Sequence, residues 1–470
     1  MSNNNFDLAV IGGGIGGYST AIYAAKKGLK VALIEQSELG GTCLNKGCIP
    51  TKALLKSSEN YQLIKNASDW GVEGTGEVQL NYLTVHNQME QVVNQLRSGV
   101  TFLMKKNQIS VFNGTGRIQG SSIFSPNGGA IAVDMGDKDE MIVPKNIVIA
   151  TGSRPKNLPN IVIDETNILS SDGLLQLTEL PKSLAIIGGG VIGVEMASLL
   201  NNFGVAVTII EYGNQLLPNE HPKLAKLLKK QFEQRGINIY LSAEVTAVSN
   251  NQVEITKGET GEKINLPVEK VLVSVGRCAN VEDVGLESMS IRHDQKGIQV
   301  NQYYQTSQPT IYAIGDVIPG IQLAHVAVRE GQIAVDHLLG KNPKLLDEKL
   351  IPKCVYTQPE LASIGVPYAQ IKKMKKDTLT GTGRFMANGK ALIERETEGF
   401  VEIIAEKETE DILYIGMIGP HVTELIAEAS LGMNMDGSPE EFMDAIHPHP
   451  SLSESMVEAA ADIYNLSINQ

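Results

Sequence analysis

The chain of 470 residues lacks the features of several large protein classes. No run of about 18 apolar residues occurs, so no membrane-spanning helix is expected. The net charge of −13 argues against nucleic acid as the main partner, because phosphate binding depends on clustered Lys and Arg. Aromatic residues amount to only 5%, whereas 46 residues are Gly, which favours an α/β protein with tight turns over a β-sandwich. Two lysine-rich stretches, 223–230 and 372–376, have helical spacing and predict solvated helix faces.

Cysteine is also scarce, with four residues in the chain. Four are too few for a disulfide scaffold, and no basic or Arg/Ser-rich presequence is visible, so we expect a cytoplasmic protein. Cys43 and Cys48 lie five positions apart, which indicates chemistry rather than a structural cross-link. Cys278 and Cys354 have apolar neighbours, and we interpret both as structural.

A repeated strand–glycine–helix–strand unit is the clearest sign of domain organisation. The first unit begins with the expected strand Phe6–Ile11, continues into a helix over 18–27, and ends with a strand at Glu35. The second begins with Leu184–Ile187, continues into a helix over 194–202, and ends at Glu211. The glycines between strand and helix are Gly12, Gly14 and Gly17 in the first unit, and Gly188, Gly190 and Gly193 in the second. Two matched units predict two Rossmann-like dinucleotide-binding domains.

The residue types in these units suit a dinucleotide. Glycines let the backbone approach a pyrophosphate, and the helix N-terminus offers free N–H groups and a positive dipole. Glu35 and Glu211 are expected to accept hydrogen bonds from ribose hydroxyls. Glu211 would repel a 2′-phosphate, and residues 211–218 contain no Arg, so the second unit favours NAD over NADP.

The rest of the chain divides around these units. A strand over 146–150 leads into a Gly-Ser-Arg-Pro connection, and the second unit ends near Arg277. The chain then returns to the first domain around 310–316, and the remainder mixes strand-like runs with amphipathic helices. The predicted divisions are 1–149 for the first domain, 150–278 for the second, 279–349 for the returning segment and 350–470 for a separate α+β domain.

The spacing of Cys43 and Cys48 limits how they can interact. On a regular α-helix their Cα atoms would be roughly 8–9 Å apart, which exceeds the span of about 7 Å that a disulfide allows. Gly47 and Pro50 place the first cysteine on an irregular turn that enters a helix, where a bridge becomes possible. A helix N-terminus also lowers a thiol pKa and so favours the reactive thiolate. Two unlinked buried cysteines are the alternative interpretation.

The segment from Gly40 to Lys52, GGTCLNKGCIPTK, resembles the redox-active segment of the dihydrolipoamide dehydrogenases, a family of flavoprotein disulfide reductases. Further stretches resemble signatures of this family in the family's order; they lie at 150–152, 275–277, 311–316, 323–325 and 356–360. The resemblance implies two Rossmann-like domains, with FAD in 1–149 and 279–349 and NAD in 150–278. It also implies that residues 350–470 form an α+β dimerisation domain of a homodimer.

The resemblance further implies individual roles. Cys43 and Cys48 would be the redox pair, and His449 and Glu454 an acid–base dyad that serves the disulfide of the opposite subunit. A carboxylate on one imidazole nitrogen fixes the tautomer and raises the basicity of the other. His447 is interpreted as part of a rigid surface turn.

The cofactor contacts follow from the same resemblance. Asp316 would bind the FAD ribitol, Gln322–His325 would line the flavin, and Lys52 would lie near the flavin ring and pair with Glu195. No metal site is predicted. The complete set of expected contacts is Gly12, Gly14, Gly17, Glu35, Thr42, Lys52, Gly116, Gly152, Gly188, Gly190, Gly193, Glu195, Glu211, Gly276, Asp316, Gln322, Leu323, Ala324 and His325.

The implied reaction is oxidation of dihydrolipoamide to lipoamide with reduction of NAD⁺. Expected partners are the lipoyl domains and acyltransferase core of a 2-oxo-acid dehydrogenase complex, or the glycine cleavage system. A glutathione-type reductase would have basic residues for NADP after the second unit, and a mercuric-type reductase would have a C-terminal cysteine pair beyond Cys354; both are absent. A non-catalytic docking component of a larger complex is the alternative from another functional class.

Overall fold

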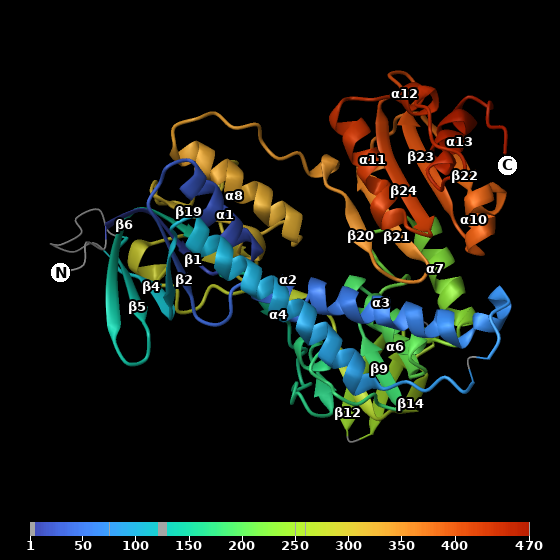
Figure 1. Cartoon of the computed structure of the whole chain (residues 1–470), viewed down its shortest axis with the longest axis horizontal. Helices are drawn as coiled ribbons and strands as arrows, with labels where there is room; N and C mark the ends of the chain where they lie inside the picture. Colours follow the sequence, from blue (N-terminus) through green and yellow to red (C-terminus); the bar gives the residue numbers. More distant parts are fainter. Residues whose placement is uncertain (1–4, 75, 121–128, 250, 259, 470) are drawn as a thin grey trace.

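The computed structural model describes residues 5–74, 76–120, 129–249, 251–258 and 260–469. Three sheets form the centres of three domains (Figure 1). The first domain lies on the left of the view, the second at the lower right and the C-terminal domain at the upper right. This arrangement agrees with the predicted fold class of two Rossmann-like domains and one α+β domain.

The first sheet has the order β3-β2-β1-β6-β5-β4, with β19 paired to β6. Strands β3, β2, β1, β6 and β19 are parallel, because helical crossovers such as α1 return the chain to the same edge. Helix α1 packs beside α8, so the returning segment contributes both a strand and a helix to this domain. The elements are β1 (Asn5–Ile11), α1 (Ile15–Lys26), β2 (Val31–Glu35), β3 (Ser110–Asn113), β4 (Thr115–Ile118), β5 (Ile131–Asp134), β6 (Asp139–Ile149), β17 (His293–Asp294), β18 (Gly297–Ile298), β19 (Ile311–Ala313) and α8 (Ala324–Leu338).

The second sheet is parallel, with the order β11-β10-β9-β15-β8, and an antiparallel group of β12, β13 and β14 lies beside it. Its core strands are continuous apolar runs, as expected for a parallel sheet covered on both faces. The elements are β8 (Ile168–Leu169), α5 (Ser171–Leu174), β9 (Ser183–Ile187), α6 (Val191–Asn202), β10 (Ala206–Ile210), α7 (Pro222–Gln234), β11 (Asn238–Tyr240), β12 (Ala243–Ser249), β13 (Gln252–Lys257), β14 (Lys263–Pro267) and β15 (Lys270–Val273).

The C-terminal sheet is antiparallel, with the order β20-β21-β24-β23-β22. Helices α11 and α13 pack against it, and apolar side chains between the layers form a separate core. The elements are β20 (Lys353–Val355), β21 (Glu360–Gly365), α9 (Tyr368–Ile371), β22 (Thr378–Arg384), α10 (Gly389–Glu394), β23 (Phe400–Glu406), β24 (Ile412–Gly419), α11 (Val422–Asn434), α12 (Pro439–Asp444) and α13 (Glu454–Ile463).

Two structures join the first and second domains. Strands β7 (Ser153–Pro155) and β16 (Arg277–Ala279) pair antiparallel, so the outgoing and returning connections run side by side. Helices α2 (Gly41–Lys46), α3 (Cys48–Lys65) and α4 (Tyr82–Lys106) extend from the first domain, and α3 packs against α6 (Figure 1). The segment with the two cysteines therefore lies at the domain junction. The 3₁₀ turns are η1 (Ala67–Trp70), η2 (Glu287–Met289), η3 (Gly315–Val317), η4 (Glu348–Leu350) and η5 (Phe385–Ala387).

The two lysine-rich stretches differ in structure. Residues 223–230 lie on α7, as the spacing predicts. The prediction of a helix over 372–376 is wrong, because α9 is a single turn that ends at Ile371. Lys375 then takes a left-handed backbone conformation with φ 52°, which a helix cannot contain. Across the described parts of the chain, no helix is long and apolar enough to span a bilayer.

Candidate active site

A cleft of about 2700 Å³ runs between the domains and brings together segments that are far apart in sequence. Its walls come from the loops after β1 and β9, from α2 and α3, from the β7–β16 connections and from the start of α8. Of the residues assigned from the sequence, the cleft is lined by Gly12, Gly14, Glu35, Thr42, Cys43, Cys48, Lys52, Gly116, Gly152, Gly190, Glu195, Gly276, Asp316, Gln322, Leu323, Ala324 and His325. Gly17, Gly188, Gly193, Glu211, His449 and Glu454 lie outside this lining.

The first and third glycines of each fingerprint are required by packing within the protein. Gly12 has φ 105°, and a side chain there would collide with the carbonyl of Ala150. Gly17 packs so closely on the backbone of Gly12 that a Cβ atom would overlap the Gly12 carbonyl. In the second domain, Gly188 likewise leaves no room for a side chain, and Gly193 packs on the backbone of Gly188 as Gly17 packs on Gly12. These glycines therefore let the helix lie close to the strand that precedes it.

The middle glycines are different, because the protein does not fill the space beside them. A Cβ atom on Gly190 would meet nothing within 4 Å, and one on Gly14 would make only an ordinary contact with Gly41. Gly14 and Gly190 are the N-caps of α1 and α6, and no side chain caps either helix. Both helices thus present free N–H groups and a positive dipole to the cleft. This arrangement fits the pyrophosphate of a dinucleotide.

The carboxylates that follow each second strand have matching environments. Glu35 accepts a hydrogen bond from the N–H of Gly13 at 2.6 Å, and Glu211 accepts one from Gly189 at 2.6 Å. The other oxygen of Glu35 accepts from the N–H of Ser37 at 2.8 Å. These bonds hold each carboxylate against the glycine loop at the end of its strand, where oxygen lone pairs remain for ribose hydroxyls.

Lys52 and Glu195 form an ion pair that connects α3 to α6. The Lys52 Nζ lies 2.7 Å from the Glu195 Oε2, and the ammonium sits 4.5 Å from the centre of the Tyr356 ring. The second oxygen of Glu195 accepts from the backbone N–H of Tyr356 at 3.0 Å. Glu195 is only 4% exposed, and these partners keep its buried charge tolerable. The pairing implied by the resemblance is present, and its role at the flavin stays a prediction.

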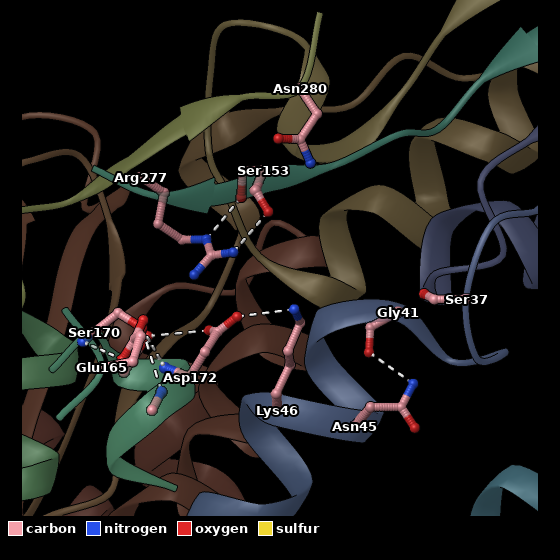
Figure 2. Close-up of polar contacts among 12 residues, drawn as sticks. Ser37, Gly41, Asn45, Lys46, Ser153, Glu165, Ser170, Asp172, Arg277 and Asn280 are labelled. Atoms are coloured by element: carbon pink, nitrogen blue, oxygen red, sulfur yellow. Dashed lines mark hydrogen bonds and ion pairs between the residues drawn. The ribbon is translucent and has the colours of Figure 1, made fainter. Parts of the chain in front are cut away.

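The start of α8 faces the cleft next to Asp316. Asp316 accepts a hydrogen bond from the hydroxyl of Ser153 at 2.5 Å. Ser153 in turn accepts from the Arg277 Nε at 2.7 Å, a contact shown in Figure 2. Helix α8 begins without a side-chain cap at Leu323, so its N–H groups are available to an anionic or carbonyl group of a ligand. Burial lowers the pKa of His325, which favours the neutral form of this imidazole.

Cys43 and Cys48 lie on different helices. The expectation that Cys43 occupies an irregular turn is wrong, because it lies within the short helix α2. The break falls one residue before Cys48, where Gly47 has φ −149° and ψ −109°, and Cys48 is the first residue of α3. This break brings the two thiols together. The two side chains are within hydrogen-bonding contact of each other.

The two thiols have opposite electrostatic environments. A hydrogen bond from the Cys43 thiol and the charge of Lys52 lower the pKa of Cys48 to about 7, against the effect of burial. The same hydrogen bond and burial raise the pKa of Cys43. The negative charge of the pair therefore resides on Cys48, with Cys43 as the proton donor.

His449 and Glu454 form a pair on the surface of the C-terminal domain. The His449 Nδ1 lies 2.8 Å from the Glu454 Oε1, and the other carboxylate oxygen accepts from the N–H of Ser451 at 2.8 Å. The His449 side chain is 80% exposed. Because neither residue lines the cleft of its own chain, the structure does not bring this pair to the cysteines.

Three further residues named from the sequence have environments that only the structure shows. His447 is not a free surface residue: its side chain is only 9% exposed, and its Nε2 lies 2.6 Å from the Glu428 Oε1. The partner comes from α11, which no local pattern indicates. Cys354 lines the cleft, and burial raises its pKa to about 11, which is typical of an unreactive thiol. Cys278 is partly exposed on β16. The structural role of both cysteines stays a prediction.

Comparison with known proteins places this geometry in a family. The pyridine nucleotide-disulphide oxidoreductase family matches residues 6–331, and the dimerisation domain of the same family matches residues 351–460. The chain belongs to the pyridine nucleotide-disulphide oxidoreductases. The predictions of a flavoprotein oxidoreductase with FAD and NAD as cofactors are thereby confirmed.

Individual relatives match over nearly the whole chain. A dihydrolipoyl dehydrogenase of Bacillus subtilis is 48% identical over 97% of this chain and 97% of its own length. A mitochondrial dihydrolipoyl dehydrogenase of Pisum sativum is 38% identical over 98% of this chain and 92% of its own length. Among solved structures, the flavoprotein disulfide reductase RclA of Escherichia coli has a TM-score of 0.85 at 29% identity, covering 97% of this chain and 99% of that chain.

Within the described ranges, no group of three or more His, Cys, Asp or Glu side chains is placed to hold a metal ion.

Proposed function

We propose that this protein is a dihydrolipoyl dehydrogenase, which oxidises dihydrolipoamide to lipoamide and reduces NAD⁺ to NADH. The observation that carries the proposal is the acidified Cys48 thiol, next to Cys43, in a cleft between two dinucleotide fingerprints. Relatives with this name match the chain at 36–48% identity over nearly its full length. When bound, FAD supplies two-electron transfer between the Cys43–Cys48 pair and NAD⁺.

The pKa difference between the cysteines assigns their roles in disulfide exchange. A substrate thiolate attacks Cys43 of the oxidised pair, the Cys43–Cys48 bond breaks, and Cys48 leaves as a thiolate. The sulfur with the lower pKa leaves faster, and here that sulfur is Cys48. The second substrate sulfur then displaces Cys43, which closes the lipoamide disulfide. The two electrons of the broken substrate thiols remain on the cysteines, and the two protons end on Cys43 and His449.

An assay with the purified FAD-loaded protein tests this proposal. We expect NADH formation from dihydrolipoamide and NAD⁺, followed by absorbance. Glutathione disulfide with NADPH serves as the competing substrate pair, and faster turnover of that pair would identify a glutathione-type reductase instead. Binding of a lipoyl domain without any turnover would support the docking interpretation.

Selectivity for NAD is proposed to depend on Glu211. Its carboxylate is fixed by the N–H groups of Gly189 and Gly213, both at 2.6 Å, so it cannot turn away from a 2′-phosphate without losing both bonds. We expect kcat/KM for NADP⁺ to be at least about 100-fold below that for NAD⁺. Similar values for both cofactors would contradict this role.

The exposed His449 supports a homodimer in which each site takes its imidazole from the other subunit. The match to a dimerisation domain over residues 351–460 agrees with this arrangement. A mixed dimer of one Cys48→Ser subunit and one His449→Gln subunit tests it. That dimer contains one site with both wild-type residues if the site is shared, and none if each site lies within one chain. Turnover in the mixed dimer, absent from either parent, is the expected result.

The physiological substrate is proposed to be a dihydrolipoyl group on a carrier domain in the cytoplasm. The carrier would belong to a 2-oxo-acid dehydrogenase complex or to the glycine cleavage system. Kinetics with reduced lipoyl domains of each type would distinguish the two, since the true carrier is expected to have the lower KM. Equal KM values for both carriers and for free dihydrolipoamide would mean that no carrier is recognised.

A further inference from the structure

Five glutamates of the described ranges are almost fully buried, and they differ in how their charge is compensated. They are Glu35, Glu195, Glu330, Glu402 and Glu406. Glu195, Glu402 and Glu406 each form an ion pair with a lysine. Glu35 accepts three hydrogen bonds, from the N–H of Gly13 and from the N–H and hydroxyl of Ser37. Glu330 has neither kind of compensation.

Glu330 lies on α8 and is 5% exposed. Its Oε2 accepts a hydrogen bond from the N–H of Gly315 at 2.6 Å, and no Lys, Arg or His of the described residues forms an ion pair with it. The charged group beside it is another carboxylate, Asp316. Burial and a neighbouring like charge both favour the protonated form of a carboxyl. Together they raise the pKa of Glu330 to about 7.

The hydrogen bond from Gly315 connects Glu330 to the wall of the cleft. Gly315 and Asp316 of turn η3 line the cleft, and so does Gly16 in the first turn of α1. Helices α1 and α8 lie side by side (Figure 1). Ala327, one turn before Glu330 on α8, packs on Gly16, where a Cβ atom would lie 3.1 Å from the Ala327 Cβ. Glu330 therefore lies behind the part of the cleft wall that meets the uncapped start of α1.

The other ionisable side chains near Glu330 and its neighbours are of types that change charge away from neutral pH. They are Asp316 on η3, Tyr304 before β19, Tyr23 on α1, Arg329 on α8 and Glu348 on η4. Burial and the charges of Glu330 and Glu348 raise the pKa of Tyr304. His325, at the start of α8, has a lowered pKa. Glu330 is thus the group of this region that we expect to titrate at and above neutral pH.

A negative charge on Glu330 would oppose binding of a dinucleotide. The start of α1 fits a pyrophosphate, which is anionic, and Asp316 already places one negative charge at the same wall. A bound pyrophosphate therefore raises the pKa of Glu330 further, because like charges favour the neutral carboxyl. By linkage, the proton that the cofactor helps to hold also strengthens binding of the cofactor.

We propose that Glu330 is a positioning residue for FAD, which holds turn η3 through Gly315 and carries a proton when FAD is bound. Affinity for FAD is then full where the carboxyl is protonated, and it decreases as the pH rises above about 7. This role requires FAD in the first domain, and it does not depend on lipoamide as the substrate.

The first test is the protonation state of Glu330 in the FAD-loaded dimer at pH 7, measured by infrared spectroscopy. A protonated carboxyl has a C=O band separate from the bands of carboxylates. We expect this band in the wild type and its loss in Glu330→Gln. Asp336→Asn is the matched control on the same helix: Asp336 is ion-paired with Lys341 at 3.0 Å and is ionised, so its substitution should leave the band in place.

The second test is the Kd for FAD at pH 6 and pH 8.5, measured by equilibrium dialysis of the FAD-loaded dimer. All proteins carry Cys48→Ser, so that the Cys48 thiolate does not contribute to the pH dependence. With Glu330 present, we expect the Kd to increase about fivefold to tenfold between the two pH values, as for a pKa that FAD raises by about one unit. In Glu330→Gln the change should be less than about twofold, because the amide is neutral at both.

The contribution of the Gly315 hydrogen bond is separated from that of the proton by comparing two variants. Glu330→Gln retains an acceptor for the Gly315 N–H, so its Kd at pH 6 should equal that of the protein with Glu330. Glu330→Leu has no acceptor, and its Kd should be at least about threefold higher at both pH values. If the leucine variant does not fold, the infrared band and the glutamine variant still decide the proposal.

Three outcomes would overturn this role. Absence of the protonated band in the wild type, or its persistence in Glu330→Gln, would show that Glu330 is ionised in the FAD-loaded protein. An equal pH dependence of the Kd in both proteins would assign the proton to another group. An FAD affinity unchanged in folded Glu330→Leu would exclude positioning through Gly315. None of these measurements uses lipoamide, so the expected results in a protein without lipoamide turnover would contradict the proposed function and leave the role of Glu330 intact.

Discussion

The Cys43–Cys48 pair and the His449–Glu454 pair differ in how many surrounding groups a single chain provides. Cys43 and Cys48 lie in a cleft whose walls come from several segments of the same chain, with Lys52 and Glu195 beside them. His449 has one carboxylate partner and otherwise faces solvent. A chain can therefore tune the acidity of a thiol within its own cleft, whereas the proposed acid–base residue His449 lies on the surface of that chain.

Substitution of Cys48 by Ser is expected to have the largest effect in this comparison. A hydroxyl cannot form the disulfide, so dihydrolipoamide turnover should fall by at least about 1000-fold. The Cys278→Ser variant is the control, because Cys278 lies on β16 outside the redox pair and should retain turnover. FAD absorbance measured on both purified proteins should be the same, since neither substitution removes a fingerprint glycine. Retained turnover in Cys48→Ser would contradict the assignment.

His449→Gln is expected to reduce lipoamide turnover by about 100-fold to 10,000-fold, the range for loss of a general acid–base. Electron transfer from NADH to an artificial acceptor should be preserved, because it bypasses the substrate thiols. His421→Gln offers a matched control in the same domain, as His421 is 63% exposed and lies 3.9 Å from Glu394. An equal loss of both activities in His449→Gln would argue against an acid–base role.

Lys52→Met tests whether the charge of Lys52 lowers the pKa of Cys48. In the wild type, alkylation of the dithiol form should increase through a midpoint near pH 7, because the pKa of Cys48 is lowered to about 7 and the thiolate is present above it. Loss of the Lys52 charge raises this pKa, and we expect the midpoint to move up by about one pH unit. At pH 7 the rate should fall about fivefold.

The control for Lys52→Met is Lys56→Met, one turn further along α3, whose ion pair with Glu59 is exposed. It should leave the alkylation midpoint unchanged. A second consequence distinguishes the two positions: Lys52→Met leaves Glu195 buried without its ammonium partner and should lower the melting temperature clearly more than Lys56→Met does. Identical profiles for the two variants would contradict the role of Lys52.

His447→Gln is expected to have the smallest effect on turnover, and it sharpens the contrast between two neighbouring His–Glu pairs. The His447 side chain is only 9% exposed and contacts Glu428, so its loss should cost about 1–3 kcal/mol of stability, seen in chemical denaturation. Turnover of the folded variant should change by less than about threefold, since His447 is not an exposed base. A loss of turnover as large as that of His449→Gln would show that both imidazoles take part.

Much of the fold could be predicted, because the residues that form each βαβ turn are close together in sequence. Gly12 and Gly188 need a left-handed backbone, and Gly17 and Gly193 need close packing on the strand, so their spacing encodes the βαβ turn directly. Glu35 and Glu211 stand at the same sequence distance from the first glycine of their units, because each ends the second strand of the same βαβ turn. By contrast, the helical spacing of residues 372–376 failed as a prediction, because α9 ends at Ile371 and the chain turns at Lys375.

The site was predictable only where residues are neighbours in sequence. The Cys43–Cys48 spacing indicated redox chemistry, but the helix around Cys43 and the break at Gly47 required the structure. The ion pair of Lys52 with Glu195 joins residues 143 positions apart, and only the resemblance to a family anticipated it. The ion pair of Lys46 with Asp172 on α5 was not anticipated at all, because a lone lysine has no pattern that identifies its counter-ion.

The sequence by itself thus predicted the two dinucleotide units and a reactive cysteine pair, since each depends on steric or chemical demands within a few residues. The acid–base role of His449 and Glu454 was implied by the resemblance to a family. The tertiary structure decided which motifs meet. It placed the cysteines between two glycine loops, gave Cys48 its thiolate character through Cys43 and Lys52, and left His449 on the outside. The physical reason is that burial, ion pairing and loop restraint depend on distances between segments that the order of residues does not specify.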